Sequence, residues 1–194
     1  MPWEGDLSDH ALVTSELAAL LQQRNGFYAF ESALHVFPSQ SKANSEQRKS
    51  LQWWNAAETW RGHFGGNASG LVFFAEDALG TQFALADRAV LRFDPETGET
   101  EPLADGIEQW AEDLMKDFSA MTAYPLAHDW QAAHGTLPPG QRLAPKEPFE
   151  LGGEFEDENL YAVDAVEGMK LRGELAKQLR DLPEGTQVQF RVVE

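Results

Sequence analysis

Residues 71–93 read LVFFAEDALGTQFALADRAVLRF, three apolar segments separated by short turns. Residues 71–76 start with a continuous apolar run, which is typical of a strand buried on both faces. Residues 81–86 alternate apolar and polar side chains, as a half-buried strand does, and residues 89–93 form a third strand. The connections have only a few residues, too few for the crossover that parallel strands need. The sequence therefore predicts three consecutive antiparallel strands.

Helices are predicted before and after these strands in the sequence. Residues 8–24 and 51–60 come before them and carry apolar residues at helical spacing, and an extended or irregular aromatic segment over 27–37 joins the two. Residues 94–99 form a tight turn because they contain Pro and Gly. Residues 106–118 follow as an amphipathic helix. The apolar face of that helix consists of Ile107, Trp110, Leu114 and Phe118.

The remainder of the chain continues the mixture of helices and strands. The expected elements are a short helix over 126–134, an extended segment over 143–151, a strand over 160–163, a helix over 165–182 and a strand over 187–192. We predict a single domain over residues 1–194, in which residues 124–194 form a C-terminal extension packed on the core. The expected fold class is α+β, mainly an antiparallel sheet flanked by helices.

Composition and charge exclude several classes of function. The chain has 194 residues, no cysteine and a formal net charge of −17 at pH 7. Such a charge repels phosphate backbones, so nucleic acid is not an expected partner, and the lack of cysteine excludes disulfides and thiolate metal sites. The apolar runs are far shorter than the roughly 20 residues that span a bilayer, and the acidic start lacks the features of a signal peptide. We therefore expect a cytoplasmic protein that does not bind membranes.

Two groups of residues, one from the first predicted strand to the helix after the strands and one upstream of them, are typical of a known protein family. The group within 71–114 comprises Phe74, Ala75, Glu76, Asp77, Gly80, Phe83, Asp94, Gly98 and Trp110. The upstream group comprises residues 26–30 together with Trp53, Trp54, Asn55, Trp60 and Arg61. Through these residues the chain resembles the SMI1/KNR4 family, part of the SUKH superfamily, over residues 24–118.

That resemblance implies a SUKH-like fold and a non-catalytic protein-binding domain, with no catalytic residues and no cofactor. Bacterial members of the family resemble immunity proteins, which block a toxin by binding it, whereas fungal members resemble scaffold proteins in cell-wall signalling. The expected partner is therefore a protein. A basic toxin domain is the first candidate, and the partner of a housekeeping scaffold is the alternative.

Two groups of acidic residues are the candidate partner-binding surfaces. They are Glu108, Glu112 and Asp113 in the predicted helix, and Glu150, Glu154, Glu156, Asp157 and Glu158 further along the chain. Dense like charges repel one another, so such groups either keep the protein soluble or serve a basic partner, whose association they accelerate. We favour the second group, because its acids are concentrated and Glu154 to Glu158 are interrupted by no basic residue.

An enzymatic alternative rests on His63, which lies in a glycine-rich segment, with Glu76 or Asp77 as its acid–base partner. A contact between these side chains in a concave pocket would favour it. Residues 94–99 resemble a calcium-binding loop, but their glycine stands one position too early, so a hairpin turn is expected there. The sequence offers no metal site and no catalytic constellation, and we predict that the protein is not an enzyme.

Overall fold

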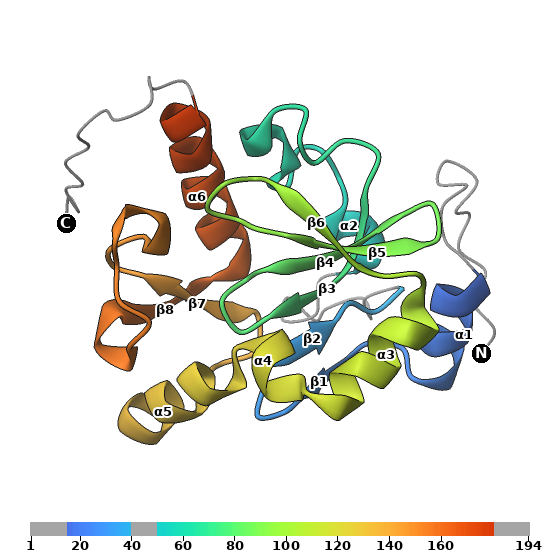
Figure 1. The fold of residues 1–194 in the computed structure, drawn as a ribbon, viewed down its shortest axis with the longest axis horizontal. Coiled ribbons are helices and arrows are strands. Elements are labelled where there is room, and N and C mark those ends of the chain that lie inside the picture. The colour runs from blue at the N-terminus through green and yellow to red at the C-terminus, as the bar shows by residue number, and fades with distance from the viewer. Residues whose placement is uncertain (1–14, 40–49, 181–194) are drawn as a thin grey trace.

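The structure is a computed structural model that describes residues 15–39 and 50–180. Its centre is a six-stranded antiparallel sheet in the order β1-β2-β3-β4-β5-β6, so each strand pairs with its neighbours in the sequence (Figure 1). The strands are β1 (Phe27–Ala29), β2 (Leu34–Val36), β3 (Val72–Asp77), β4 (Gln82–Ala86), β5 (Ala89–Phe93) and β6 (Thr100–Ala104). The three strands predicted from the sequence correspond to β3, β4 and β5, and their antiparallel pairing is confirmed.

Helices flank this sheet, which confirms the α+β fold class. They are α1 (Ser15–Gln23), α2 (Leu51–Trp54), α3 (Ile107–Lys116), α4 (Phe118–Thr122), α5 (Tyr124–His134) and α6 (Ala165–Arg180), with three 3-10 helices η1 (Arg61–Phe64), η2 (Phe149–Leu151) and η3 (Asp157–Asn159). The predicted amphipathic helix is α3, which buries Ile107, Trp110 and Leu114. In the part of the chain that the structure describes, no helix is both long and apolar enough to cross a membrane.

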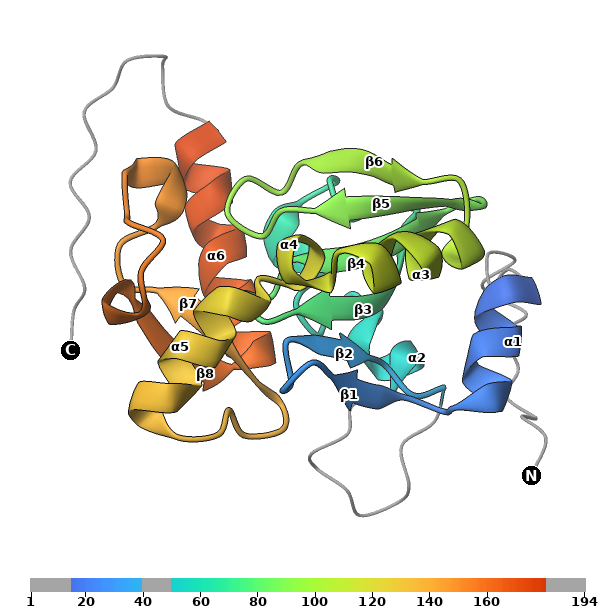
Figure 2. The same ribbon diagram turned by 60° about the horizontal axis from the view of Figure 1, so that its bottom comes forward.

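Both faces of β3 are buried, as its apolar run predicts. The ring of Phe73 lies edge-on to Trp60, with centroids 4.8 Å apart, whereas the ring of Phe74 lies edge-on to Trp110 at 5.0 Å. In the regular pairing of β4 with β5, Phe93 contacts Trp60, and Phe83, whose partner is Arg92, contacts Trp110. Because successive side chains of a strand point to opposite faces, the segment around Trp60 and helix α3 cover different sides of the sheet. Figure 2 shows α3 lying across one of these sides.

The prediction of one helix over 51–60 is wrong beyond Trp54. Asn55 ends α2 because its buried side chain binds β3. Its Nδ2 donates to the carbonyl oxygens of Leu51 and Phe73, at 2.9 and 2.8 Å, and its Oδ1 accepts the N–H of Phe73 at 2.8 Å. These bonds tie the chain to the sheet, and it continues in turns instead of a helix.

The sheet is also larger than the sequence pattern indicates. Residues 27–37 contain the hairpin of β1 and β2. Residues 100–104 form β6, which the pattern does not predict because Thr100, Glu101 and Pro102 are all exposed. The predicted strand over 187–192 lies outside the described residues.

The C-terminal lobe, residues 124–180, contains α5, α6 and a separate two-stranded antiparallel sheet of β7 (Gln141–Pro145) and β8 (Leu160–Asp164). Figure 1 shows it beside one end of the main sheet. The lobe has its own small core around Trp130, Leu137 and Leu143.

The lobe and the main sheet interlock. The turn between β3 and β4 enters the lobe, where Ala78 is fully buried and its carbonyl oxygen accepts the N–H of Leu143 at 2.8 Å. In the other direction, Val166, Met169 and Ala176 of α6 join the core of the main sheet. Residues 124–180 and the main sheet are therefore joined by contacts in both directions.

Candidate functional site

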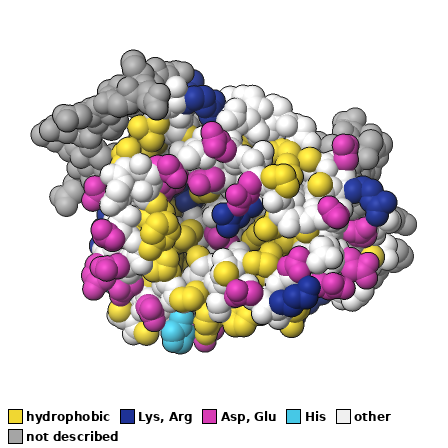
Figure 3. Space-filling view, in the orientation of Figure 1, with side chains coloured by type: hydrophobic (Ala, Val, Ile, Leu, Met, Phe, Trp, Pro, Cys, Tyr) yellow, Lys and Arg dark blue, Asp and Glu magenta, His cyan; other side chains and the backbone are white. Residues whose placement is uncertain are grey.

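The acidic loop, residues 147–159, joins β7 to β8. Its acidic candidates are Glu150, Glu154, Glu156 and Glu158, which are exposed, and Asp157, which is half-buried. Within residues 15–39 and 50–180, no basic side chain forms an ion pair with any of them. Figure 3 shows acidic side chains along the left edge of the molecule, where Figure 1 places this loop. The loop thus displays negative charge that no described side chain neutralises by pairing.

Asn159 closes the acidic loop at its base. Its Nδ2 donates to the carbonyl oxygens of Glu147 and Glu154, both at 3.0 Å, and its Oδ1 accepts the N–H of Glu147 at 2.9 Å. Lys146 adds two bonds, from its N–H to the carbonyl oxygen of Asn159 at 2.6 Å and from its Nζ to that of Glu158. The two ends of the loop are therefore held together, and its carboxylates extend from an ordered backbone.

Two further contacts fix the course of the acidic loop. A Cβ atom at Gly153 would lie 2.0 Å from the carbonyl oxygen of Glu147, so only glycine fits there. Glu96, buried in the turn between β5 and β6, accepts the N–H of Glu150 through Oε2 at 3.0 Å. Burial raises the pKa of Glu96, although the bond from Glu150 and the charge of Arg172 act against this. The main sheet thus contributes an anchor for the loop.

Phe155 gives the acidic loop an exposed aromatic ring. Its side chain is 64% exposed, and its ring stacks on that of Phe149 with centroids 4.0 Å apart and planes 4° apart. Phe149 packs in turn on the core of the C-terminal lobe. The lobe also exposes Tyr161 and Leu171, and Figure 3 shows hydrophobic side chains next to the acidic edge. Aromatic residues are enriched in protein–protein interfaces, so this surface combines charge with an apolar contact point.

Replacing Asn159 by alanine should lower the free energy of unfolding by about 1 to 2 kcal/mol, because three hydrogen bonds are lost at a partly exposed site. The backbone amides of the acidic loop should also exchange faster. Urea denaturation and hydrogen exchange measure the two effects. Gln22→Ala, at an exposed position of α1, is the control. Unchanged hydrogen exchange in the acidic loop of Asn159→Ala would contradict the inference that Asn159 holds the ends of the loop together.

The second acidic candidate surface lies on α3, apart from the acidic loop (Figure 1). Glu108 and Glu112 are exposed. Asp113 pairs with Nζ of Lys116 at 2.9 Å and accepts from Nε2 of Gln109 at 2.9 Å, and these bonds lower its pKa. The structure therefore does not bring the two acidic groups together, and α3 neutralises part of its own charge.

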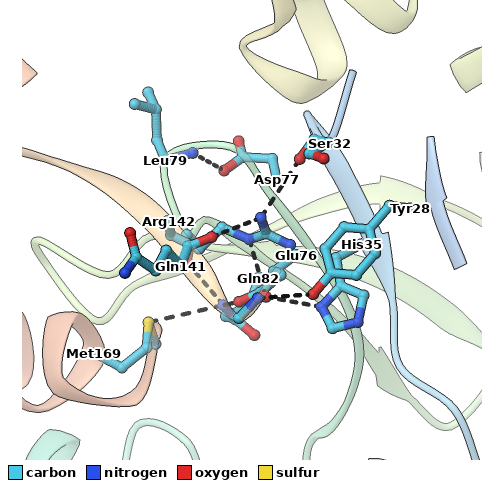
Figure 4. Close-up of polar contacts among 12 residues, drawn as sticks. Tyr28, Ser32, His35, Glu76, Asp77, Leu79, Gln82, Gln141, Arg142 and Met169 are labelled. Carbon is cyan, nitrogen blue, oxygen red and sulfur yellow. Dashed lines mark hydrogen bonds and ion pairs between the residues drawn. The ribbon is translucent and has the colours of Figure 1, made fainter. Parts of the chain in front are cut away.

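A buried polar cluster lies where the C-terminal lobe meets the main sheet (Figure 4). At its centre, Oε1 of Glu76 lies 3.0 Å from Nδ1 of His35 and 2.9 Å from Nε of Arg142. Gln82 approaches the other oxygen of the carboxylate, and all four residues are at least nine-tenths buried. Burial alone would raise the pKa of Glu76, but Arg142 and His35 outweigh it and the pKa is lowered. The Glu76 carboxylate is therefore ionised inside the protein at neutral pH.

Aromatic contacts complete the buried polar cluster. The ring of Tyr28 stacks on His35 with centroids 4.1 Å apart and planes 5° apart, and the guanidinium carbon of Arg142 lies 5.3 Å from the centre of the Tyr28 ring. The hydroxyl of Tyr28 accepts the N–H of Gly140 at 3.1 Å. Because Arg142 lies on β7 and its partners on β1 and β3, the cluster binds the lobe to the main sheet.

Asp77, the last residue of β3, follows Glu76 of this cluster and precedes the turn to β4. Its Oδ1 accepts the N–H groups of Leu79 and Thr81, both at 2.9 Å. Burial raises the pKa of Asp77 to about 6, in spite of these bonds and of the charge of Arg142. From α6, the guanidinium of Arg172 donates to the carbonyl oxygen of Leu79. The turn that enters the lobe is thus held by the carboxylate of Asp77 and by Arg172 of α6.

The contact of His63 with Glu76 or Asp77, which would favour the enzymatic alternative, is not formed. Nδ1 of His63 lies 2.7 Å from Oε1 of Glu174, because η1 packs directly on α6. Gly173 permits this close approach, since a Cβ atom there would lie 2.9 Å from that of His63. Glu76 and Asp77 are buried elsewhere, so the three side chains do not assemble into a site.

Residues 94–99 form the turn between β5 and β6, as predicted. The N–H of Gly98 donates to the carbonyl oxygen of Asp94 at 2.8 Å, which closes the hairpin. Among the residues that the structure describes, no group of three or more His, Asp and Glu side chains is arranged to hold a metal ion.

Sequence reasoning located the acidic residues but missed Asn159 and the stacked pair of Phe149 and Phe155. One signal for the pair was present. Phe155 stands alone between Glu154 and Glu156, and an apolar residue within an acidic segment is either a core contact or a binding contact. The clamp by Asn159 has no such signal, because it depends on how the loop closes.

Comparisons with known proteins place the fold. No protein-family model and no curated protein matches the chain. A similar solved structure is that of Atu4351 from Agrobacterium tumefaciens, with a TM-score of 0.51 and 14% sequence identity over 83% of this chain and 75% of that chain. At this identity the similarity concerns the fold alone. The chain therefore shares an α+β fold with Atu4351.

Proposed function

We propose that this chain is a non-catalytic protein-binding domain and that the acidic loop is the surface on which its partner docks. In its specific form, the proposal is an immunity protein of the SMI1/KNR4 type, which acts in the cytoplasm and neutralises a basic toxin domain by direct binding. The observation that carries the proposal is the exposed ring of Phe155, held by Phe149 within a loop whose candidate carboxylates form no ion pair with any described side chain.

Such a surface suits a basic protein for three physical reasons. Unpaired carboxylates accelerate the encounter with an oppositely charged partner. The clamp by Asn159 orders the loop beforehand, which reduces the conformational entropy lost on binding. The exposed ring of Phe155 adds an apolar contact that charge alone does not supply. The kind of partner comes from the family resemblance, and the likeness to Atu4351 supports only the fold.

Reversing three acids of the loop, Glu154→Lys, Glu156→Lys and Glu158→Lys, should slow association with a basic partner by about tenfold or more at low salt. The partner to use is a toxin domain encoded next to the gene of this protein. Association rates are measured at about 50 mM and about 300 mM salt, and the difference from the wild type should shrink at the higher concentration. These side chains are exposed, so the fold should persist, which circular dichroism checks.

A matched control reverses Glu108, Glu112 and Asp113 on α3, which changes the net charge by the same amount. Its effect on the association rate should be much smaller. If the α3 variant slows association more than the loop variant, the docking surface is α3. If both variants associate like the wild type and salt has no effect, electrostatic docking is wrong.

A further inference from the structure

The exposed face of Phe155 is available to a partner. Its ring rests on Phe149 on one side, at 4.0 Å between centroids, while the side chain remains 64% exposed. Phe149 is fixed against the core of the C-terminal lobe, so the ring has a rigid support. A ring held in this way offers a flat surface whose position is set before binding.

The residues next to Phe155 determine which charge a partner group that covers its ring must carry. Glu154 and Glu156 precede and follow it, and both are exposed. An apolar partner covering the ring would also remove these carboxylates from water without compensation, which is costly. The nearby Lys146 donates to a backbone carbonyl oxygen, that of Glu158, and forms no ion pair with a described carboxylate. A cationic group is therefore the complementary occupant.

Between the two cationic side chains, the flat ring favours arginine. A guanidinium group is planar, stacks on aromatic faces, is less strongly hydrated than an ammonium group, and presents paired N–H groups to a carboxylate. Lysine offers a compact, well-hydrated charge instead. An exposed ring whose two neighbours in the chain are exposed carboxylates thus matches arginine in shape as well as in charge.

The protein already contains this arrangement in its buried polar cluster (Figure 4). There, the Tyr28 ring is stacked on His35, the guanidinium of Arg142 lies over Tyr28, and the carboxylate of Glu76 lies 2.9 Å from Nε of that arginine. The acidic loop has the stacked ring pair and the carboxylates on its surface, without the arginine.

We propose that the acidic loop binds an arginine side chain of the partner protein, with the guanidinium on the exposed face of Phe155 and its N–H groups directed to the neighbouring carboxylates. This inference rests on the proposed function and names the partner residue that the same surface recognises. It makes Phe155 the residue that distinguishes arginine-bearing partners from merely basic ones.

Two capped peptides of equal charge, Gly-Arg-Gly-Arg-Gly-Arg and Gly-Lys-Gly-Lys-Gly-Lys, test the proposal on the full chain by NMR titration at low salt. The arginine peptide should bind about threefold tighter or more, and it should shift the ring resonances of Phe155. Phe155→Leu keeps an apolar side chain but removes the ring, and it should abolish the preference. Leu171→Ala, which alters another exposed hydrophobic residue of the lobe, should leave the preference unchanged.

Equal affinity for both peptides, a preference that survives in Phe155→Leu, or no binding of either peptide would overturn the inference. These outcomes are separate from the test of the proposed function. If the charge reversals slow association with the protein partner but arginine is not preferred, the proposed docking surface is supported and the arginine site is refuted. If arginine is preferred but the reversals have no effect on association, the site exists but is not the docking surface.

Discussion

Replacing Arg142 by methionine should lower the free energy of unfolding by about 3 to 5 kcal/mol, a large part of the stability of an ordinary domain. Arg142 and Glu76 are both only 1% exposed, and Nε of the arginine lies 2.9 Å from Oε1 of the glutamate. Methionine occupies comparable space but leaves the Glu76 carboxylate buried without its guanidinium. Urea denaturation at neutral pH measures the loss.

The double variant Arg142→Met with Glu76→Gln tests the cause of this loss. Removing the buried charge together with its partner should restore part of the stability, so the double variant should unfold at higher urea than Arg142→Met alone. Arg92→Met is the matched control, because Arg92 pairs with Glu101 at an exposed site, where such a pair contributes about 0 to 1 kcal/mol. Equal losses in Arg142→Met and Arg92→Met would show that the buried pair does not hold β7 to the sheet.

Replacing Asp77 by asparagine should raise the free energy of unfolding at neutral pH by about 2 to 3 kcal/mol. Burial raises the pKa of Asp77 from 3.8 to about 6, so above that pH the folded protein holds a carboxylate that its surroundings disfavour. Asparagine retains an Oδ1 atom that can accept the N–H groups of Leu79 and Thr81, and it has no charge to bury. Urea denaturation of both proteins measures the gain.

The gain in the free energy of unfolding from Asp77→Asn should increase as the pH rises. The folded state binds the proton of Asp77 more tightly than the unfolded state, so this group favours folding at low pH and the benefit is lost as pH rises through about 6. The variant and the wild type should therefore be equally stable only below the ordinary pKa of 3.8, and the difference should be complete above about pH 7. The pKa of Glu76 is shifted in the opposite direction, but Glu76 is present in both proteins. Its contribution therefore cancels when the stabilities of the variant and the wild type are subtracted. A gain that does not change with pH would contradict the explanation.

The sequence predicts those parts of the fold that depend on local pattern. The strands β3 to β5 follow from alternating or continuous apolar residues and from short connections, and α3 follows from its apolar stripe. Helix α2 is shorter than its pattern, because Asn55 makes long-range bonds to Phe73 that no local rule contains. Strand β6 is missed because an exposed edge strand has no apolar face to reveal it.

In the candidate site, too, the features that follow from local sequence can be predicted and those that depend on long-range contacts cannot. The exposure of the acidic loop follows from its composition, since six carboxylates cannot share a core. The buried polar cluster could not be predicted, because His35, Glu76 and Arg142 come from strands far apart in the sequence. A charged residue within an otherwise apolar strand, such as Glu76, indicates that a partner exists, but it does not say which residue that partner is.

The order of the strands has a consequence for the chain during its synthesis. Every strand of the main sheet pairs with the next one in the sequence, so the whole sheet can close while the C-terminal lobe is still emerging from the ribosome. Until β7 arrives, the carboxylate of Glu76 lacks the guanidinium of Arg142, and His35 is its ion-pair partner within the main sheet. Arg142 lies on β7, whose pairing with β8 also brings the two ends of the acidic loop together. The surface that we propose for docking is therefore formed only once β7 and β8 have paired, after the strands of the main sheet.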